Sequence, residues 1–106
     1  METTNVSDVA EFSEEKMKKN AIFDSPHLFY DAYCLLPGQS QKVHAHEGSD
    51  KVYFVVRGAG RFTVGDEEAD LTEGNAVIAR AGVPHGVRND SGDELVLLVT
   101  MAPRPS

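Results

Sequence analysis

Short apolar runs, each bounded by glycine, proline or acidic residues, make up most of the chain beyond residue 27. Runs of this length that are rich in branched and aromatic side chains are typical of β-strands. Helical periodicity is almost absent after residue 20. The pattern therefore predicts an all-β sandwich or barrel of roughly seven to nine short strands. The strands that we expect are 28–36, 52–56, 61–64, 70–71, 76–79, 85–89 and 94–101.

Two of these runs are apolar on both faces. The final run, ELVLLVTM at 94–101, has no polar alternation, and neither has 52–56 apart from the hydroxyl of Tyr53. A half-solvated sheet alternates apolar and polar positions, so we expect these strands to be covered on both sides by a second sheet or a second subunit. We therefore expect a homodimer that buries one sheet, with the N-terminal segment reaching across.

The polar N-terminal segment allows two interpretations. Residues 1–27 are expected to form an arm and a first strand, and 28–106 the β-barrel of a single domain. Ser13 has the side chain to cap a short helix over 14–20, because its hydroxyl can accept a free backbone N–H group. The same segment equally fits a lead-in to a strand at 21–23. The sequence leaves this choice open.

Charge and cysteine content narrow the class of protein. Seventeen acidic and ten basic residues give a net charge of -7 and argue against nucleic acid as a partner. The single cysteine, Cys34, has no intramolecular disulfide partner and lies in an apolar run, which predicts a buried thiol. No secretory leader pattern is present, and no apolar run approaches the ~20 residues that span a bilayer. These features predict a cytoplasmic protein without membrane contact.

Three histidines form the strongest chemical signal. His44 and His46 are two residues apart, so on a strand both imidazoles point to the same side. His85 follows 39 residues later, after a turn formed around Gly82 and Pro84. Neutral imidazole is a good ligand for divalent transition metals, so these histidines are candidate ligands. His27, beside the turn at 24–26, is expected to be an exposed turn residue.

The spacing around these histidines resembles the two motifs of the cupin family. The first motif is a glycine, five residues, H-x-H, three or four residues, a glutamate, six residues and a glycine, and it fits 38–58. The second motif is a glycine, five residues, P-x-G, two residues, a histidine, three residues and an asparagine. Its positions are matched by Gly74, Gly82, His85 and Asn89, except that Arg80 stands where the family has a proline. The resemblance implies a cupin-type β-barrel, a double-stranded β-helix or jelly roll. It also implies a divalent ion, Fe, Mn, Zn or Ni, held by His44, His46 and His85.

The glutamate of the first motif is missing. Counting back from Gly58 places Lys51 at its position, whereas the shorter spacing from His46 places Asp50 there as a possible fourth ligand. These neighbours face opposite sides of a strand. The spacing to Gly58 favours Lys51 as the inward residue, whereas simple apolar patterning favours Asp50. An ammonium ~5 Å from a dication is repelled by on the order of 6 kcal/mol at an effective dielectric near 20, so Lys51 is expected to be neutral, turned away or beside an empty site.

Further polar residues are candidates for contact with a ligand. Tyr53, Lys51 and Arg61 are the candidate catalytic residues, and an arginine can hold a carboxylate through two hydrogen bonds. Asn89 is expected to be a turn residue. Weaker candidates are Arg80, Arg88 and Glu47.

Two functions fit this sequence. The first is an enzyme, such as a metal-dependent oxygenase or isomerase, in which a three-histidine centre acts on a small molecule inside the barrel. The second is a non-catalytic module that binds a small anion or sugar. The missing carboxylate ligand and the absence of a second plausible acid–base pair both slightly favour the binding module. The cupin fold hosts both classes, so the fold does not choose between them.

Overall fold

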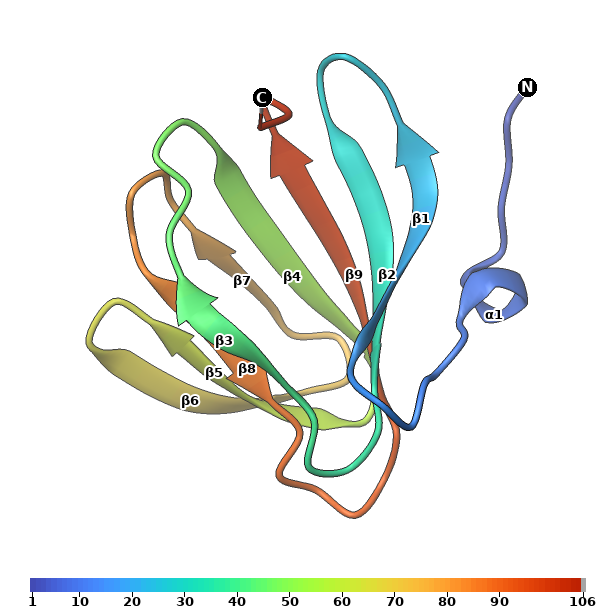
Figure 1. The fold of residues 1–106 in the computed structure, drawn as a ribbon, viewed down its shortest axis with the longest axis vertical. Coiled ribbons are helices and arrows are strands. Elements are labelled where there is room, and N and C mark those ends of the chain that lie inside the picture. Colours follow the sequence, from blue (N-terminus) through green and yellow to red (C-terminus); the bar gives the residue numbers. More distant parts are fainter. Residues whose placement is uncertain (106) are drawn as a thin grey trace.

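A computed structural model describes residues 1–105 of the chain and shows one short helix and nine strands in them (Figure 1). Each strand expected from the sequence is present, with boundaries that agree to within a few residues. The elements are α1 (Val6–Val9), β1 (Lys18–Asp24), β2 (Phe29–Leu35), β3 (Ser40–His44), β4 (Asp50–Arg57), β5 (Ala59–Val64), β6 (Glu67–Thr72), β7 (Ala76–Ala79), β8 (His85–Arg88) and β9 (Leu95–Ala102).

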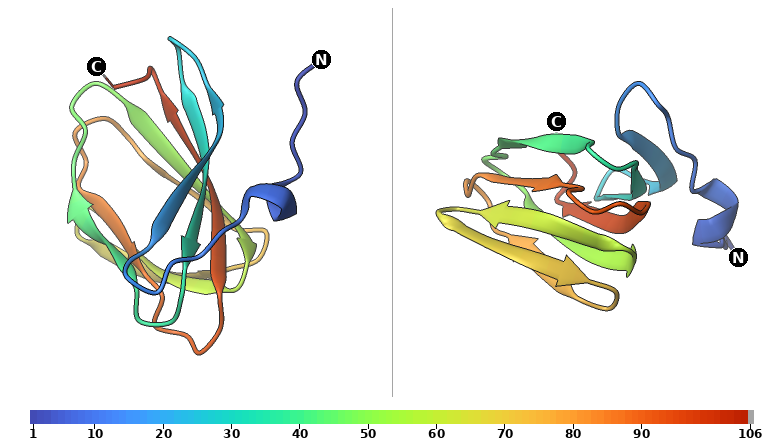
Figure 2. Two further views of the ribbon diagram at one scale, coloured as in Figure 1. Left: turned by 45° about the vertical axis from the view of Figure 1, so that its right-hand side comes forward. Right: turned by 90° about the horizontal axis from the view of Figure 1, so that it is seen from below.

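The strands form two antiparallel sheets that face each other (Figures 1 and 2). One sheet has the order β1-β2-β9-β4-β7 and the other the order β3-β8-β5-β6. Their inner faces enclose an apolar core, which excludes water from the base of the barrel. The architecture is the all-β jelly roll that the sequence predicts. Its core consists of Tyr33, Leu35, Tyr53, Val55, Phe62, Val87, Leu95, Leu97 and Val99.

The register of β4 is the one that the spacing to Gly58 favours. Lys51, Tyr53 and Val55 are buried, whereas Asp50 and Phe54 are exposed. Gly58 ends this strand with a φ of 91°, a conformation that side chains other than glycine rarely adopt. A Cβ atom there would lie 2.3 Å from the carbonyl oxygen of Glu94. The turn therefore requires a glycine at position 58. The position of this turn determines which residues of β4 face inward.

The N-terminal segment adopts the strand alternative. β1 pairs with β2 at the edge of the five-stranded sheet, with a register shift between Ala21 and Phe23. The Ser13 hydroxyl accepts a hydrogen bond of 3.3 Å from the Glu15 backbone nitrogen, but no helix follows it. One helical turn, α1, was not expected, and the Asn5 side chain caps it. No helix in residues 1–105 is both long and apolar enough to cross a membrane.

The outer face of the five-stranded sheet is apolar and partly exposed. Phe54 of β4 is 38% exposed and Ile78 of β7 is 37% exposed. Leu98 of β9 pairs with Phe54, and Val52 pairs with Ile78, so the four side chains lie on one face. The other sheet covers only the inner face, so in a single chain these two-sided apolar strands keep one partly solvated side.

Candidate metal centre

Three imidazoles meet at one end of the barrel. His44 is the last residue of β3, His85 is the first of β8, and the two are register partners in the four-stranded sheet. His46 lies in the loop that follows β3 rather than on the strand itself. One ligand nitrogen from each side chain can be chosen so that all three lie within 4.8 Å of one another. The structure thus brings together the three histidines proposed as ligands.

A β-bulge aims His44 into the barrel. Between Gln41 and His44 the strand β3 advances three residues while its partner β8 advances two, from Val87 to His85. Strict alternation would place Gln41 and His44 on opposite faces, but the extra residue lets both project inward. Val43 accommodates the irregularity with its side chain 55% exposed. The bulge therefore adds Gln41 to the inward side chains below the histidines.

Gly86 allows the two histidine-bearing strands to approach closely. A Cβ atom at this position would lie 2.8 Å from the carbonyl oxygen of Gln41 and 3.0 Å from the backbone nitrogen of Val43. Contacts this short would push β3 away from β8. The missing side chain of Gly86 is therefore a condition for placing His44 beside His85.

Backbone carbonyls fix the ring orientation of two histidines. Nδ1 of His44 lies 2.7 Å from the carbonyl oxygen of Lys42, and Nδ1 of His85 lies 2.9 Å from that of Val83. A carbonyl only accepts hydrogen bonds, so each Nδ1 carries a proton, and in the neutral form of each ring Nε2 then presents a lone pair. This second-sphere arrangement is typical of metal-binding histidines.

The donor set fits a divalent transition metal. Nε2 of His85 is buried and has no hydrogen-bond partner in residues 1–105, as expected for a nitrogen whose partner is a metal ion. Burial lowers the pKa of His85 and of His46, and the positive charge of Lys51 lowers both further. Both imidazoles are therefore neutral at pH 7, the state in which they bind metals. A metal held there would have all-nitrogen protein ligands and further positions open to a ligand.

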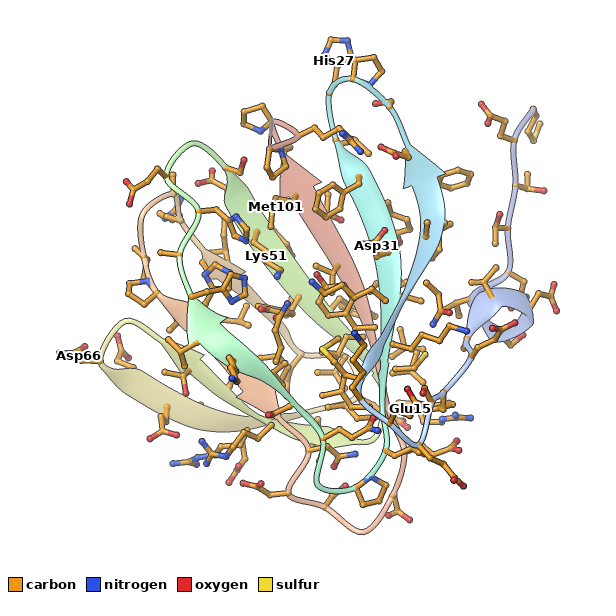
Figure 3. The ribbon with its side chains drawn as sticks, in the orientation of Figure 1. Glu15, His27, Asp31, Lys51, Asp66 and Met101 are labelled. Carbon is orange, nitrogen blue, oxygen red and sulfur yellow. The ribbon has the colours of Figure 1, made fainter. Side chains whose placement is uncertain are left out.

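Lys51 lies inside the barrel beside this group. Its side chain is 1% exposed, and Figure 3 shows it pointing inward from β4, near the strand β3. Nζ lies 3.4 Å from Oε1 of Gln41 and 5.1 Å from the ring centroids of both Tyr33 and Tyr53. Burial, with a smaller effect of Lys19, lowers the pKa of Lys51 to about 7. The amine is thus able to be neutral or charged near physiological pH.

Asp50 lies on the opposite side of β4 and does not join the histidines. Its Oδ1 accepts a hydrogen bond of 2.8 Å from the backbone nitrogen of Ala81, and the side chain is exposed. Because the residue alternates with Lys51 on the strand, its carboxylate faces away from the barrel. The hypothesis of Asp50 as fourth ligand therefore does not fit the structure. Its observed role is to tie the β7–β8 turn to β4.

Of the candidate catalytic residues, Tyr53 lies inside the barrel and Arg61 lies outside it. Arg61 lies outside the barrel, 3.3 Å from Asp70 and 3.6 Å from Glu68, because Phe62 takes the inward position of β5. Tyr53 is fully buried, and its hydroxyl donates a hydrogen bond of 2.6 Å to Oε1 of Gln41. Burial raises its pKa above the usual value, so the phenol stays protonated.

The weaker candidates also lie outside the group of histidines. Arg80 and Glu47 are exposed in loops, and Arg88 makes contacts of 3.3 Å with Asp90 and 3.6 Å with Glu68. Asn89 is buried, and its amide donates to the carbonyl oxygens of Leu35 and Asp93.

Three structural expectations from the sequence are confirmed. Asn89 is a turn residue, since its Oδ1 accepts hydrogen bonds from Ser91. His27 is exposed at the turn between β1 and β2. Cys34 is buried, and burial raises the pKa of its thiol, which disfavours the reactive thiolate.

Two polar residues of this region were not found from the sequence. Gln41 was hidden by the bulge, because three residues before His44 it would face outward on a regular strand. Asp31 projects inward from β2, since it lies two residues before the buried Tyr33 and therefore on the same face of the strand. Figure 3 shows Asp31 on β2 and Met101 on β9 beside β4, which carries Lys51. Burial raises the pKa of Asp31, and Lys19 and Lys51 oppose this effect.

Comparison with known proteins identifies the family. The sequence profile of the Cupin domain family matches residues 32–101, which contain the last four residues of β2, all of β3 to β8, and β9 except its last residue. The chain therefore belongs to the cupin family, and the two-sheet barrel with its histidines is a small single-domain cupin.

Solved and curated relatives agree with this assignment. The structure is similar to that of TT1209 from Thermus thermophilus, with 52% identity, a TM-score of 0.97, and coverage of 99% of this chain and 100% of that one. An uncharacterized protein of Streptomyces coelicolor, SCO3923, is 44% identical over 64 residues, which span 60% of this chain but only 58% of that protein. The oxalate-binding protein of Thermotoga maritima is 26% identical over 80% of this chain and 69% of its own length.

Proposed function

We propose that this cupin binds a divalent metal ion through His44, His46 and His85, and that the bound metal in turn binds a small oxygen-rich anion. The observation that carries this proposal is the buried Lys51 in place of the family's carboxylate ligand. Three neutral imidazoles leave the +2 charge of the ion uncompensated, and the amine of Lys51 adds a positive charge whenever it is protonated. An anion is the ligand that this electrostatic environment favours.

Lys51 and the metal are compatible because the lysine can lose its proton. Its pKa of about 7 allows a neutral amine when the metal binds alone, which avoids the repulsion between two cations. When an anion lies between them, a protonated Lys51 and the metal both attract it. Imidazole ligands suit Zn²⁺, Ni²⁺ and Fe²⁺ better than Mn²⁺, which prefers oxygen.

The relative from Thermotoga maritima supports the class of ligand. Oxalate, the ligand in that protein's name, is a small oxygen-rich dianion. A chain that is similar over 80% of its length and carries an uncompensated positive site is suited to a ligand of the same chemical class. The proposal covers the class of small carboxylates rather than oxalate itself.

Calorimetry on metal-free protein tests this function. Zn²⁺ or Ni²⁺ should bind with one ion per chain, and oxalate should then bind the loaded protein at least about tenfold more tightly than the metal-free protein. The tightening is expected because the metal supplies open coordination positions. The proposal would be contradicted if neither Zn²⁺ nor Ni²⁺ bound, or if the affinity for oxalate were the same with and without metal.

Proton transfer is the second candidate function, and Lys51 is the observation that favours it. An amine with a pKa of about 7 is well matched to accept or donate a proton at neutral pH. In an isomerisation it would take a proton from the carbon next to a ligand carbonyl. Nuclear magnetic resonance of pyruvate in D₂O tests this activity. Deuterium uptake that depends on the metal-loaded protein and is lost in Lys51→Met would support it, and exchange at the rate without protein would exclude it for this ligand.

A further inference from the structure

The hydrogen bonds of the interior below the histidines converge on one acceptor, the amide oxygen of Gln41. Oε1 of Gln41 accepts from the Tyr53 hydroxyl at 2.6 Å and lies 3.4 Å from Nζ of Lys51. The tyrosine hydroxyl and an ammonium are both donors here, so the amide oxygen must face them and the amide nitrogen must point elsewhere. One acceptor thus serves two donors.

The remaining donors have no partners. Gln41 is 8% exposed, and its Nε2 has no partner at hydrogen-bond distance in residues 1–105, although the amide is near enough to the Tyr33 hydroxyl to lower the pKa of that phenol. Lys51 carries three N–H groups when protonated, yet Oε1 of Gln41 is its one hydrogen-bond acceptor among these residues. Asp31 attracts Lys51 electrostatically, but no hydrogen bond joins the two side chains. Buried donors without acceptors are unfavourable, and they mark a place where another molecule supplies the acceptor.

We infer that Lys51 and Gln41 form a second contact for the ligand of the metal centre, and that this ligand is a small acid with acceptors at both ends, a dicarboxylate or a 2-oxo acid. This inference rests on the proposed function, because one end of the ligand occupies the metal. The other end would receive hydrogen bonds from Nζ of Lys51 and Nε2 of Gln41, which satisfies both orphan donors.

Tyr53 lies close to both proposed contact points. The Tyr53 ring centroid lies 6.1 Å from that of His85 and 5.1 Å from Nζ of Lys51. Nζ of Lys51 and the His85 ring therefore both lie close to one buried tyrosine, and a short acid of about two to four carbon atoms is the ligand that we expect to bridge them.

Anion affinities of the Ni²⁺-loaded protein test this inference. Malonate and acetate are titrated into wild type, Lys51→Met and Gln41→Leu, with Arg61→Met as the control outside the barrel. Malonate can chelate nickel in every variant, so the diagnostic quantity is the ratio of malonate to acetate affinity. The ratio should fall about tenfold or more in Lys51→Met and several-fold in Gln41→Leu, and remain unchanged in Arg61→Met.

The outcomes separate this inference from the proposed function. An unchanged ratio in both Lys51→Met and Gln41→Leu, with nickel still bound, would overturn the second contact and leave the metal function standing. Loss of nickel binding in wild type would overturn both. If Lys51→Met fails to fold, as judged by thermal unfolding, the ratio in Gln41→Leu decides: a several-fold fall supports the second contact and an unchanged ratio overturns it.

Discussion

Asp50 and Lys51 are neighbours on β4 whose side chains lie on opposite faces, with Lys51 1% exposed in the barrel and Asp50 exposed at the surface. This alternation puts a cation where the cupin motif has a carboxylate ligand, and it puts the nearest carboxylate where it cannot reach the histidines. The electrostatic character of the site follows from this one-residue choice of register.

Lys51→Glu should therefore tighten binding of the divalent metal about tenfold or more. The change replaces a repulsion by an attraction and supplies a carboxylate beside three imidazoles, and each factor of ten corresponds to about 1.4 kcal/mol. Asp50→Asn is the matched control and should change metal affinity little, because that side chain faces outward. Calorimetric titration with Zn²⁺ measures both. If Asp50→Asn weakened Zn²⁺ binding and Lys51→Glu had no effect, Asp50 rather than Lys51 would be the residue beside the metal.

The pH dependence of stability should carry the signature of Lys51. Its pKa is lowered to about 7 in the folded chain, whereas an unfolded lysine titrates near 10.4. Between pH 7 and 10 the unfolded state therefore binds more protons, and this group raises the free energy of unfolding by about 1.4 kcal/mol per pH unit. Below pH 7 both states are protonated, and the folded state bears the full cost of the buried ammonium.

Lys51→Met should remove this contribution. Relative to wild type, the variant should gain most stability near pH 6.5, and the gain should shrink toward pH 9.5. Urea unfolding at both pH values measures the difference, and Lys16→Met, at an exposed position, is the control. A gain that is equal at the two pH values would show that Lys51 keeps an ordinary pKa.

Gly86→Ala should damage both stability and metal binding. The new Cβ atom would lie 2.8 Å from the Gln41 carbonyl oxygen, so β3 must shift away from β8 at a cost of about 1–3 kcal/mol. His44 would move with β3, and Zn²⁺ affinity should fall with stability. Gly92→Ala is the control, because a Cβ there meets no atom within 4 Å. Wild-type Zn²⁺ affinity in folded Gly86→Ala would show that the close approach of the strands is not needed for the centre.

We propose that a second copy of the chain covers the outer face of the five-stranded sheet. Two chains that each carry a charge of -7 meet with least repulsion through uncharged surfaces, and Phe54 and Ile78 lie at such a surface. Phe54→Lys should convert a dimer into the 11.5 kDa monomer in light scattering. Val43→Lys, at an exposed apolar position on the other sheet, should not. A monomeric wild type at micromolar concentration would contradict this assembly.

The strands could be predicted because each ends at residues with few conformational choices. Gly65-Asp66 closes the β5–β6 hairpin as expected, and 76–79 is β7 with the same bounds. Gly58 also gave the register of β4 correctly, since the tight turn at this residue fixes the count back to Lys51. Apolar patterning alone pointed to Asp50, because this buried strand is apolar on both faces.

The lining of the site was less predictable, because it depends on contacts between distant segments. The bulge in β3 is defined by its pairing with β8, so no local pattern reveals that Gln41 faces inward with His44. Arg61 had the chemistry to bind a carboxylate ligand, but Glu68 and Asp70 on the adjacent strand β6 hold it outside the barrel. The choice between β1 and a helix after Ser13 was likewise made by pairing with β2.

The metal stoichiometry and affinity of His85→Ala, compared with wild type and His27→Ala, test the central claim most directly. His27 is a matched control because it is a histidine exposed far from the group, at the β1–β2 turn. Wild type and His27→Ala should each bind one Ni²⁺ per chain, whereas His85→Ala should lose at least about a hundredfold in affinity while remaining folded, because it removes a direct ligand. Binding of one Ni²⁺ per chain by His85→Ala with the affinity of wild type would contradict the three-histidine centre.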